Sequence, residues 1–466
     1  MLHNKQDIAR CILITNLAIF FTVLFLQAQN STVGETCGYG QPGDGLGNTA
    51  FTIYTNPAQD CSTCMNISWA TPPGVKCAIE VRDEETGELT LYEAYDGSGP
   101  DLDSVPQIYY ESHNYRSRAF KDIRTKNRLN ESVREQPVFD KHGYELFDLH
   151  PDREYSYRIV TYNDSTGQEE YSDRRSFITA GAKEWRAAVI GDFHHYSPLQ
   201  RRVDAAMGML DVLDSVADGF DWVLSTGDQV AAGGMYNCWD ELSEQPYYVD
   251  FMWASVQGNH DQMALDNSVK TDDFFRDSHF FPYNGYEGQE GVSYWFRYGD
   301  VLFIMLNNEG MKSQESLLPA LEWMERVVEQ NPSKYVVVVE HHQWIIGQDG
   351  TRSQLERFYR TFDRLGVDLA LSGHNHVYLR THPLRDREPV EPEEGTVYVV
   401  TPSSDDSRGR DMKHLKDNRD LIDIRWSEGE NTVGAMIMDV NPERIEMTLY
   451  DRYGEVQDSF IVPAKR

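Results

Sequence analysis

The chain has 466 residues, of which 40% are hydrophobic and 12% aromatic, and its formal net charge at pH 7 is −32. This hydrophobic content excludes a disordered chain, and the length favours two or three domains. The negative charge disfavours binding to nucleic acid or to anionic membranes, because both need basic surfaces. An anionic substrate would have to be attracted locally, against the field of the whole chain.

The N-terminus has the pattern of an export signal. Lys5 and Arg10 precede the apolar run 11–26, and small residues follow it. This order predicts a signal peptide over residues 1–28. The run is short for a membrane-spanning helix, and an uncleaved signal anchor is the alternative. We expect a secreted, periplasmic or extracellular protein with no membrane segment after cleavage.

Most of the cysteines lie in the first segment after this signal. Cys37, Cys61, Cys64 and Cys77 are expected to form two disulfide bonds, because the protein is expected to be exported. The alternative for the C-x-x-C pair is half of a metal site, but no second pair follows nearby. Cys238 is expected to be a buried free thiol.

Residues 30–180 are predicted to form an all-β domain. Short alternating or aromatic-rich runs are separated by Gly, Pro, Asn and Asp, as is typical of a β-sandwich. The runs cover residues 51–55, 65–70, 77–83, 89–94, 107–112, 154–162 and 175–179. Residues 98–140 are polar and irregular, and this half gathers no candidate ligands.

Residues 185–466 change to strands that alternate with helices, which predicts an α/β domain. The expected helices cover residues 199–216, 314–330 and 351–365. Strands return at residues 397–400, 434–440, 444–451 and 459–463. The charged segment 402–430 is expected to be a loop or lid.

Five polar clusters in this second half each follow an apolar run of strand length. They are AAVIGDFHH (187–195), WVLSTGD (222–228), WASVQGNHD (253–261), VVVVEHH (336–342) and LALSGHNH (369–376). Each cluster is therefore expected where a strand ends, which is where open α/β sheets place their chemistry. Of the 14 histidines in the chain, half lie in these clusters.

The side chains of the clusters suit two divalent or trivalent metal ions that share a carboxylate. Asp228, which follows a glycine at a strand end, is the candidate bridge. Asp192 and His194 point the same way on an extended segment and can share one metal. His374 and His376 have the same spacing and can supply one imidazole to each metal.

Further polar residues complete this set. Asn259 offers a neutral oxygen ligand, and either His341 or His342 offers another imidazole. His260, paired with Asp261, is the candidate catalytic group that binds a phosphoryl oxygen or protonates the leaving oxygen. Candidate substrate contacts are His195, Arg201, Arg202, His342 and Arg380.

The order GD-x-H, GD, GNHD, a strand ending in His, and GH-x-H is similar to that of the calcineurin-like metallophosphoesterases. The segment GHNHVYLRTHP (373–383) resembles the purple acid phosphatases more narrowly. The resemblance implies a multidomain chain. A fibronectin-III-like β-sandwich at residues 30–180 would precede a four-layer α/β/β/α catalytic domain at residues 185–466.

The resemblance also implies a ligand set for two ions, with iron, zinc or manganese as candidates. The first metal would take Asp192, His194, Asp228 and His376, and the second would take Asp228, Asn259, His341 and His374. His341 is preferred to His342 because the first histidine after the strand matches the family pattern. Ala231 stands where the purple enzymes have the iron-binding tyrosine, so no purple colour is expected.

These patterns predict an exported, acid-phosphatase-like phosphoesterase with two metals. We expect it to cleave small phosphomonoesters with a metal-activated hydroxide that attacks phosphorus in line. A phosphodiesterase with the same metals is one alternative. A non-catalytic surface-binding protein with an inert metal site is the other, but a decayed site would have lost ligands. The oligomeric state is left open.

Overall fold

The computed structural model describes residues 50–72, 75–93, 140–163, 166–181, 184–196, 202–233, 236–262, 273–309, 311, 313–345, 353–412 and 419–465. The chain divides into two compact units, Met1–Asp44 and Gly45–Arg466. The first unit, with the predicted signal peptide, lies outside the described residues. Within the described ranges, none of the helices has both the length and the apolar character needed to cross a lipid bilayer.

Two antiparallel sheets form the N-terminal part of the described chain. One sheet has the order β1-β2-β5, and the other has the order β4-β3-β6-β7 with β8 also paired to β6. The strands are β1 (Phe51–Pro57), β2 (Met65–Thr71), β3 (Lys76–Asp83), β4 (Leu89–Glu93), β5 (Asp140–Leu146), β6 (Glu154–Tyr162), β7 (Glu169–Tyr171) and β8 (Arg175–Ile178). This architecture confirms the all-β prediction for this part.

Aromatic side chains fill the interior of this β-sandwich. The Tyr157 ring on β6 is buried against Phe177, and its hydroxyl lies 2.7 Å from Thr55 Oγ1 on the other sheet. Trp69 on β2 is also buried. Six of the seven predicted runs become strands, and the run 107–112 lies outside the described residues.

The cysteines correct one prediction. Cys61, Cys64 and Cys77 are free thiols, Cys238 is buried, and Cys37 lies outside the described residues. The Cys61 thiol is buried beside a methionine sulfur, whereas Cys77 is buried separately on β3. The predicted pairs therefore do not form among the described cysteines. Burial also raises the pKa of the Cys77 thiol to about 12, which disfavours the reactive thiolate.

Two mixed sheets form the C-terminal part, with strand orders β11-β10-β9-β21-β22-β23 and β12-β13-β14-β15-β19-β16-β20. The six-stranded sheet contains β9 (Trp185–Ile190), β10 (Trp222–Ser225), β11 (Met252–Ser255), β21 (Gly434–Val440), β22 (Arg444–Asp451) and β23 (Val456–Pro463). The seven-stranded sheet contains β12 (Tyr294–Tyr298), β13 (Val301–Leu306), β14 (Tyr335–Glu340), β15 (Leu369–Ser372), β16 (Tyr378–Thr381), β19 (Val397–Val400) and β20 (Ile422–Trp426). A small hairpin joins β17 (Leu384–Arg385) to β18 (Glu388–Pro389).

The sheets pack face to face through large aromatic side chains. Trp185 on β9 and Trp222 on β10 contact Tyr298 on β12 and Phe303 on β13. Such rings bury much apolar area and prefer the tilted and edge-on contacts seen here. This aromatic layer is the centre of the C-terminal core.

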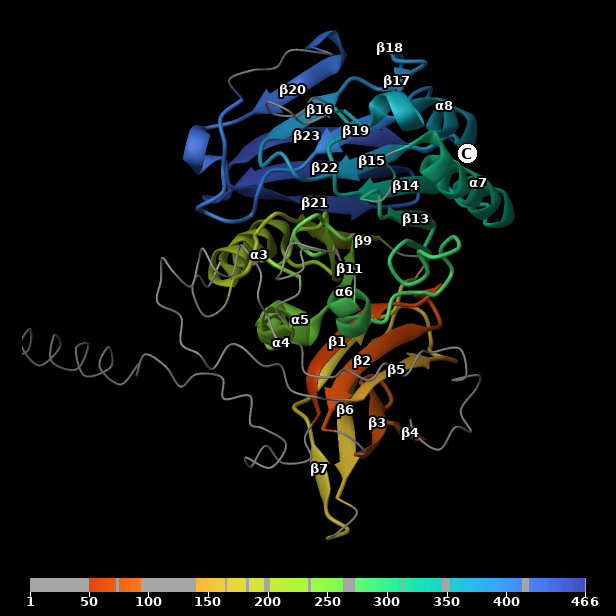
Figure 1. Ribbon diagram of the computed structural model, residues 1–466, viewed down its shortest axis with the longest axis vertical. Coiled ribbons are helices and arrows are strands. Elements are labelled where there is room, and N and C mark those ends of the chain that lie inside the picture. Colours follow the sequence, from red (N-terminus) through yellow and green to blue (C-terminus); the bar gives the residue numbers. More distant parts are fainter. Residues whose placement is uncertain are drawn as a thin grey trace, which may run out of the picture. The chain divides into compact units, whose positions relative to one another are not determined.

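The helices of this part are α3 (Val203–Ala217), α4 (Tyr236–Ser243), α5 (Pro246–Asp250), α6 (Asp273–Ser278), α7 (Gln314–Gln330) and α8 (Leu355–Leu365). Helices α3, α7 and α8 cover the outer faces of the two sheets, whereas α4, α5 and α6 contact strands of the β-sandwich. Helix α3 contacts β9 and β21, and α7 and α8 lie side by side over the seven-stranded sheet (Figure 1). Trp344, Phe358 and Leu317 belong to the core beneath α7 and α8. This part is therefore a helix–sheet–sheet–helix sandwich, as predicted.

Local chemistry explains where two of these helices begin and end. The side chain of Ser313 accepts a hydrogen bond from Ser316 N, so α7 begins at the predicted residue. Helix α8 ends at Gly366, whose left-handed φ of 64° suits a helix C-terminus. It begins at Leu355, a few residues after the predicted start.

The segment 402–430 contains more regular structure than the predicted loop. It includes η3 (Arg419–Leu421), β20 and η4 (Gly429–Asn431). Strand β20 pairs with β16 at the edge of the seven-stranded sheet. Its apolar residues alternate with the exposed Asp423 and Arg425. An edge strand of this kind buries one face only, so its short pattern looks charged and loop-like in the sequence.

His279 follows α6 and lies in an aromatic cluster that joins the β-sandwich to the C-terminal part. Its ring contacts Tyr54 on β1, Trp239 on α4 and Phe281. Its Nδ1 donates to Phe275 O at 2.9 Å, and burial lowers its pKa to about 3. Since the unfolded side chain titrates near 6.5, the unfolded state binds more protons below that pH. The native state is therefore destabilised as the pH falls from about 6.5 towards 3.

We expect His279→Phe to make unfolding less sensitive to acid. Relative to the parent, the free energy of unfolding of the variant should improve by on the order of 1 kcal/mol for each pH unit between about 6 and 4. Denaturant unfolding at several pH values measures this slope. His150→Gln, at an exposed histidine, is the control and should leave the slope unchanged. Equal slopes for the parent and His279→Phe would contradict the role assigned to burial.

Candidate metal centre

The five predicted clusters all follow strands that end on the same side of the two sheets. Strands β9, β10 and β11 are parallel, and so are β13, β14, β15 and β19, so each set presents its carboxyl ends together. The predicted ligands follow β9, β10, β11, β14 and β15, and they are Asp192, His194, Asp228, Asn259, His341, His374 and His376. The structure brings all seven together.

The backbone at these strand ends is unusual. Five of the eleven described non-glycine residues with positive φ are predicted ligands. Their φ values lie between 49° and 71°, and they are Asp192, His194, Asp228, His374 and His376. Side chains other than glycine rarely adopt this left-handed conformation, which costs roughly 1–2 kcal/mol for each residue. Strain concentrated in this way indicates that the chain is bent to aim side chains at one point.

Glycines before the ligands allow this close packing. A Cβ atom on Gly258 would overlap Asp228 Oδ1, and a Cβ atom on Gly373 would overlap Asp192 Oδ2. The glycines of the GNHD and GH-x-H motifs are therefore required because a neighbouring ligand occupies the space of a side chain.

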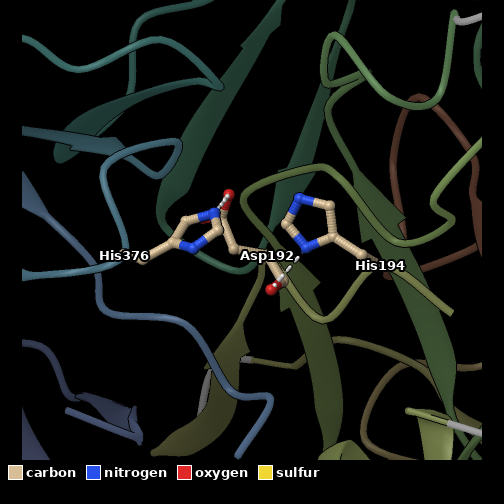
Figure 2. Close-up of side chains that lie close together, drawn as sticks. All are labelled: Asp192, His194 and His376. Carbon is tan, nitrogen blue, oxygen red and sulfur yellow. Dashed lines mark hydrogen bonds and ion pairs between the residues drawn. The ribbon is translucent and has the colours of Figure 1, made fainter. Parts of the chain in front are cut away.

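Asp192, His194 and His376 form one group whose potential ligand atoms lie within 4.8 Å of one another. His376 Nε2 lies 3.4 Å from Asp192 Oδ1, and His194 Nε2 lies 3.1 Å from Asp228 Oδ2. Figure 2 shows the rings of His194 and His376 on either side of Asp192. Asp228 therefore adjoins this group, as a shared ligand must.

Asp228, His341 and His374 form a second group within the same distance limit. His341 Nε2 lies 3.2 Å from Asp228 Oδ2, 3.2 Å from Asn259 Oδ1 and 3.3 Å from His374 Nδ1. The predicted second-metal ligands thus meet around one nitrogen atom. Asp228 lies beside the ligands of both groups, which is the arrangement expected of a carboxylate that bridges two metals.

Backbone carbonyl groups orient four of the imidazole rings. His194 Nδ1 lies 2.8 Å from Asp192 O, and His341 Nδ1 lies 2.8 Å from Thr226 O. His376 Nδ1 bonds Arg408 O and His260 Nδ1 bonds Ala231 O, each at 2.8 Å. A carbonyl oxygen only accepts, so Nδ1 carries the proton in each ring. When such a ring is neutral, its Nε2 keeps a lone pair, which is the state in which histidine binds a metal.

The charges of the site also suit cations. Burial alone would raise the pKa of Asp228, but His341, His260 and His194 hold it well below its usual range. Burial lowers the pKa values of His194 and His374 to about 3, so both are neutral at pH 7. Burial also acts to lower the pKa of His341, but Asp228 outweighs it and raises the value to about 10. His341 Nε2 and Asp228 Oδ2 thus share a proton in this structure. A metal cation bound to both atoms would take the place of that proton.

The predicted pairing of His260 with Asp261 does not form. Asp261 instead accepts hydrogen bonds from three backbone N–H groups, those of Asp228, Gly258 and Val230, at 2.9–3.1 Å. It therefore holds the Asp228 loop against the Asn259 loop. Burial and the neighbouring Asp228 raise the pKa of Asp261 to about 8.

His260 itself lies at the centre. Its ring centroid is 4.6 Å from that of His194, and its ligand atom groups with those of His194 and Asp228. Its backbone N–H donates to Asp228 Oδ1 at 2.7 Å. The residue is half-buried, so its Nε2 can reach a substrate beside the predicted ligands.

The predicted substrate contacts lie in different surroundings. Arg202 donates to the backbone oxygen of His194 at 3.3 Å, and the His342 ring centroid is 4.5 Å from that of His374. Both thus border the centre. His195 is buried and its Nε2 bonds Glu241 at 3.0 Å. Arg201 lies outside the described residues.

Arg380 is engaged elsewhere. Its guanidinium pairs with Asp458 at 2.7 Å and with Asp423 at 2.6 Å, and it stacks on Phe460. These contacts join β16 to strands β20 and β23. The side chains of Arg380 and His195 are thus occupied by partners outside the ligand cluster.

Sequence patterns missed the residues that hold this centre from outside the five clusters. Ser403 Oγ donates to Asp192 O at 2.7 Å, and Arg408 supplies the carbonyl that fixes His376. Glu309 forms an ion pair with His342. These residues lie in segments without hydrophobic periodicity, and no short motif marks them in the sequence.

Two buried carboxylates, an amide oxygen and several imidazoles with exposed lone pairs are a ligand set for borderline or hard metal ions. On a four-layer α/β sandwich, this set defines a metal-dependent hydrolase domain with a dinuclear metal site. Residues 186–378 match the family model described as calcineurin-like phosphoesterase. The chain therefore carries a calcineurin-like phosphoesterase domain and is a metal-dependent phosphoester hydrolase.

Two solved structures with a similar fold align with more of the chain than residues 186–378. A purple acid phosphatase from seeds of yellow lupin (Lupinus luteus) aligns with a TM-score of 0.68 at 16% identity, over 89% of this chain and 74% of that one. PhoD aligns with a TM-score of 0.54 at 11% identity, over 89% of both chains. At these identities the likeness concerns the fold. No curated protein matches the sequence.

Proposed function

We propose that this protein is an exported phosphomonoesterase with two metal ions. The first ion is held by Asp192, His194, Asp228 and His376, and the second by Asp228, Asn259, His341 and His374. Export is inferred from the N-terminal sequence pattern, and the monoester preference from the likeness in fold to an acid phosphatase. Iron, zinc and manganese remain the candidate ions.

The observation that carries this proposal is the convergence of all seven predicted ligands. They come from five strand ends, yet Asp228 Oδ2 lies within 3.2 Å of nitrogens from His194 and His341. A decayed, purely binding site would have lost members of this set. When bound, the two ions supply an activated water and neutralise charge on the phosphoryl oxygens.

The other residues orient and protonate the substrate. His260 has its Nδ1 proton committed to Ala231 O, so a second proton resides at Nε2 when the ring is charged. From there it can pass to the leaving oxygen. Asp261 is a positioning residue, because it fixes the backbone of Asp228 and Gly258. His342, held by Glu309, borders the second metal position.

Hydrolysis of a chromogenic phosphomonoester and of its diester analogue tests the proposal. We expect chelation to abolish turnover and to lower the melting temperature, because an ion that binds the native state stabilises it. Adding back iron, zinc or manganese should restore turnover with a preference for the monoester.

The assay separates the alternatives. Faster cleavage of the diester would replace the phosphomonoesterase by a phosphodiesterase with the same metal centre. Metal binding without cleavage of either substrate would favour the non-catalytic binding protein. An intense purple colour in the iron-loaded protein would contradict the proposed ligand set, which contains no tyrosine.

A further inference from the structure

The loop 401–412 runs beside the proposed first metal and is tied to its ligands. Ser403 Oγ donates to Asp192 O at 2.7 Å, and Ser404 N donates to Gly191 O at 3.0 Å. Arg408 O accepts the Nδ1 proton of His376 at 2.8 Å. These bonds fix the position of the loop backbone against the ligands themselves.

The side chain of Arg408 is not used by this network. Its Nε is buried without a hydrogen-bond partner, and no described residue forms an ion pair with its guanidinium. The group nevertheless interacts electrostatically with Asp192 and Asp228, so it lies in the field of the metal centre. An arginine that is half-buried and unpaired at such a place is poised for an anion.

A second arginine lies beside it. Arg202 precedes α3, and its Nε lies 3.3 Å from Asp405 Oδ2, on the same loop as Arg408. One of its terminal nitrogens donates to His194 O at 3.3 Å. Asp405 is fully buried, and Arg202 is its ion-pair partner among the residues that the structure describes. Burial lowers the pKa of Arg408, and repulsion from Arg202 and Arg410 lowers it further.

This concentration of positive charge contrasts with the rest of the chain. The net charge is −32, yet Arg202 and Arg410 both repel the Arg408 guanidinium, which also interacts with Asp192 and Asp228 of the ligand cluster. Two bound cations would carry more charge than Asp192 and Asp228 neutralise. An anion relieves the repulsion of the Arg408 guanidinium from the two bound cations, and one with two negative charges does so most strongly.

We propose that Arg408, with Arg202 beside it, binds the non-bridging oxygens of a dianionic terminal phosphate and so selects phosphomonoesters over diesters. The proposal rests on the proposed function and adds the residue that sets its substrate class. A guanidinium matches two phosphate oxygens with a pair of parallel N–H donors. A diester carries one negative charge and has a substituent in place of one of these oxygens, so it gains less from the same group.

Titration calorimetry with the metal-loaded protein tests this without turnover. The probes are inorganic phosphate and dimethyl phosphate, measured with the parent, Arg408→Gln, Arg408→Lys and the control Arg425→Gln. Arg425 is exposed on β20 and lies outside the ligand cluster. Metal content is measured in each protein. It should be unchanged, because the backbone carbonyl that holds His376 is retained in every variant.

For Arg408→Gln we expect phosphate affinity to fall about 10- to 100-fold, with dimethyl phosphate much less affected. Arg408→Lys should lie between the parent and Arg408→Gln, because it keeps the charge but loses the paired donors. Unchanged phosphate affinity in both variants, or equal weakening of both probes, would overturn the proposal. Loss of metal in Arg408→Gln together with parent-like binding by Arg408→Lys would also overturn it. Normal phosphate binding without hydrolysis would count against the proposed function alone.

Discussion

Asp228→Asn should abolish phosphoester hydrolysis and empty the metal centre. Turnover is expected to fall by at least on the order of 10³-fold, which corresponds to roughly 4 kcal/mol of transition-state stabilisation. The substitution keeps the shape of the side chain but removes its charge. The measurements are kcat for the chromogenic monoester and metal content by elemental analysis.

The physical reason lies in the number of atoms that share this carboxylate. Asp228 Oδ2 lies 3.1 Å from His194 Nε2 and 3.2 Å from His341 Nε2, and its Oδ1 accepts from His260 N at 2.7 Å. Asp228 is 1% exposed, so water and dissolved ions cannot compensate for the loss of its negative charge. A neutral amide cannot balance two cations, and we expect both ions to bind more weakly.

Asp439→Asn is the matched control for this substitution. Asp439 lies on β21 and forms a partly exposed ion pair with Arg186 at 2.8 Å, which contributes little to stability. It should leave both turnover and metal content unchanged. If Asp228→Asn kept normal metal content and activity, the bridging role would be wrong.

The neighbouring histidines His341 and His342 should behave differently when each is replaced by alanine. We expect His341→Ala to lose metal and to lower turnover by on the order of 10³-fold. His342→Ala should keep its metals and lose roughly tenfold in turnover, as expected for a substrate contact. Metal content and kcat/KM measured for the pair distinguish a ligand from a contact.

The surroundings of the two rings support the assignment of His341 as the ligand and His342 as the substrate contact. His341 is buried, its Nδ1 is fixed by Thr226 O at 2.8 Å, and its Nε2 faces Asp228, Asn259 and His374. His342 is partly exposed and pairs with Glu309 instead. Glu309→Gln is a second check, because it should reproduce part of the His342→Ala effect with metals retained. Metal loss confined to His342→Ala would reverse the assignment.

Strand-end chemistry was predictable because it is local. A run of β-branched and apolar residues followed by GD, GNHD or GH-x-H specifies both a buried strand and the polar group at its end. The clusters after β9, β10, β11, β14 and β15 were all located in this way. Helix α7 was bounded correctly because its first turn is capped by a serine, which is also a local signal.

Several elements were missed because their signals are weak or not local. Strand β20 alternates apolar with charged residues at a sheet edge, so its short sequence is hard to distinguish from that of a charged loop. The disulfide prediction rests on the number of cysteines, whereas the burial of Cys61 and Cys77 as free thiols depends on the packing of the sandwich. His260 and Asp261 are adjacent in sequence, yet the Asp261 carboxylate turns to three backbone N–H groups.

The sequence by itself determined the class of chemistry, because the types and order of the ligands are written in short motifs at strand ends. Only the tertiary structure decided how those ligands are held. The carbonyls of Thr226, Ala231 and Arg408 set the direction of three imidazoles, and they come from loops remote from these rings in the chain. The same is true of the unpaired Arg408 guanidinium. Its position depends on a loop that packs against the ligands, and such contacts between distant segments leave no periodic pattern in the sequence.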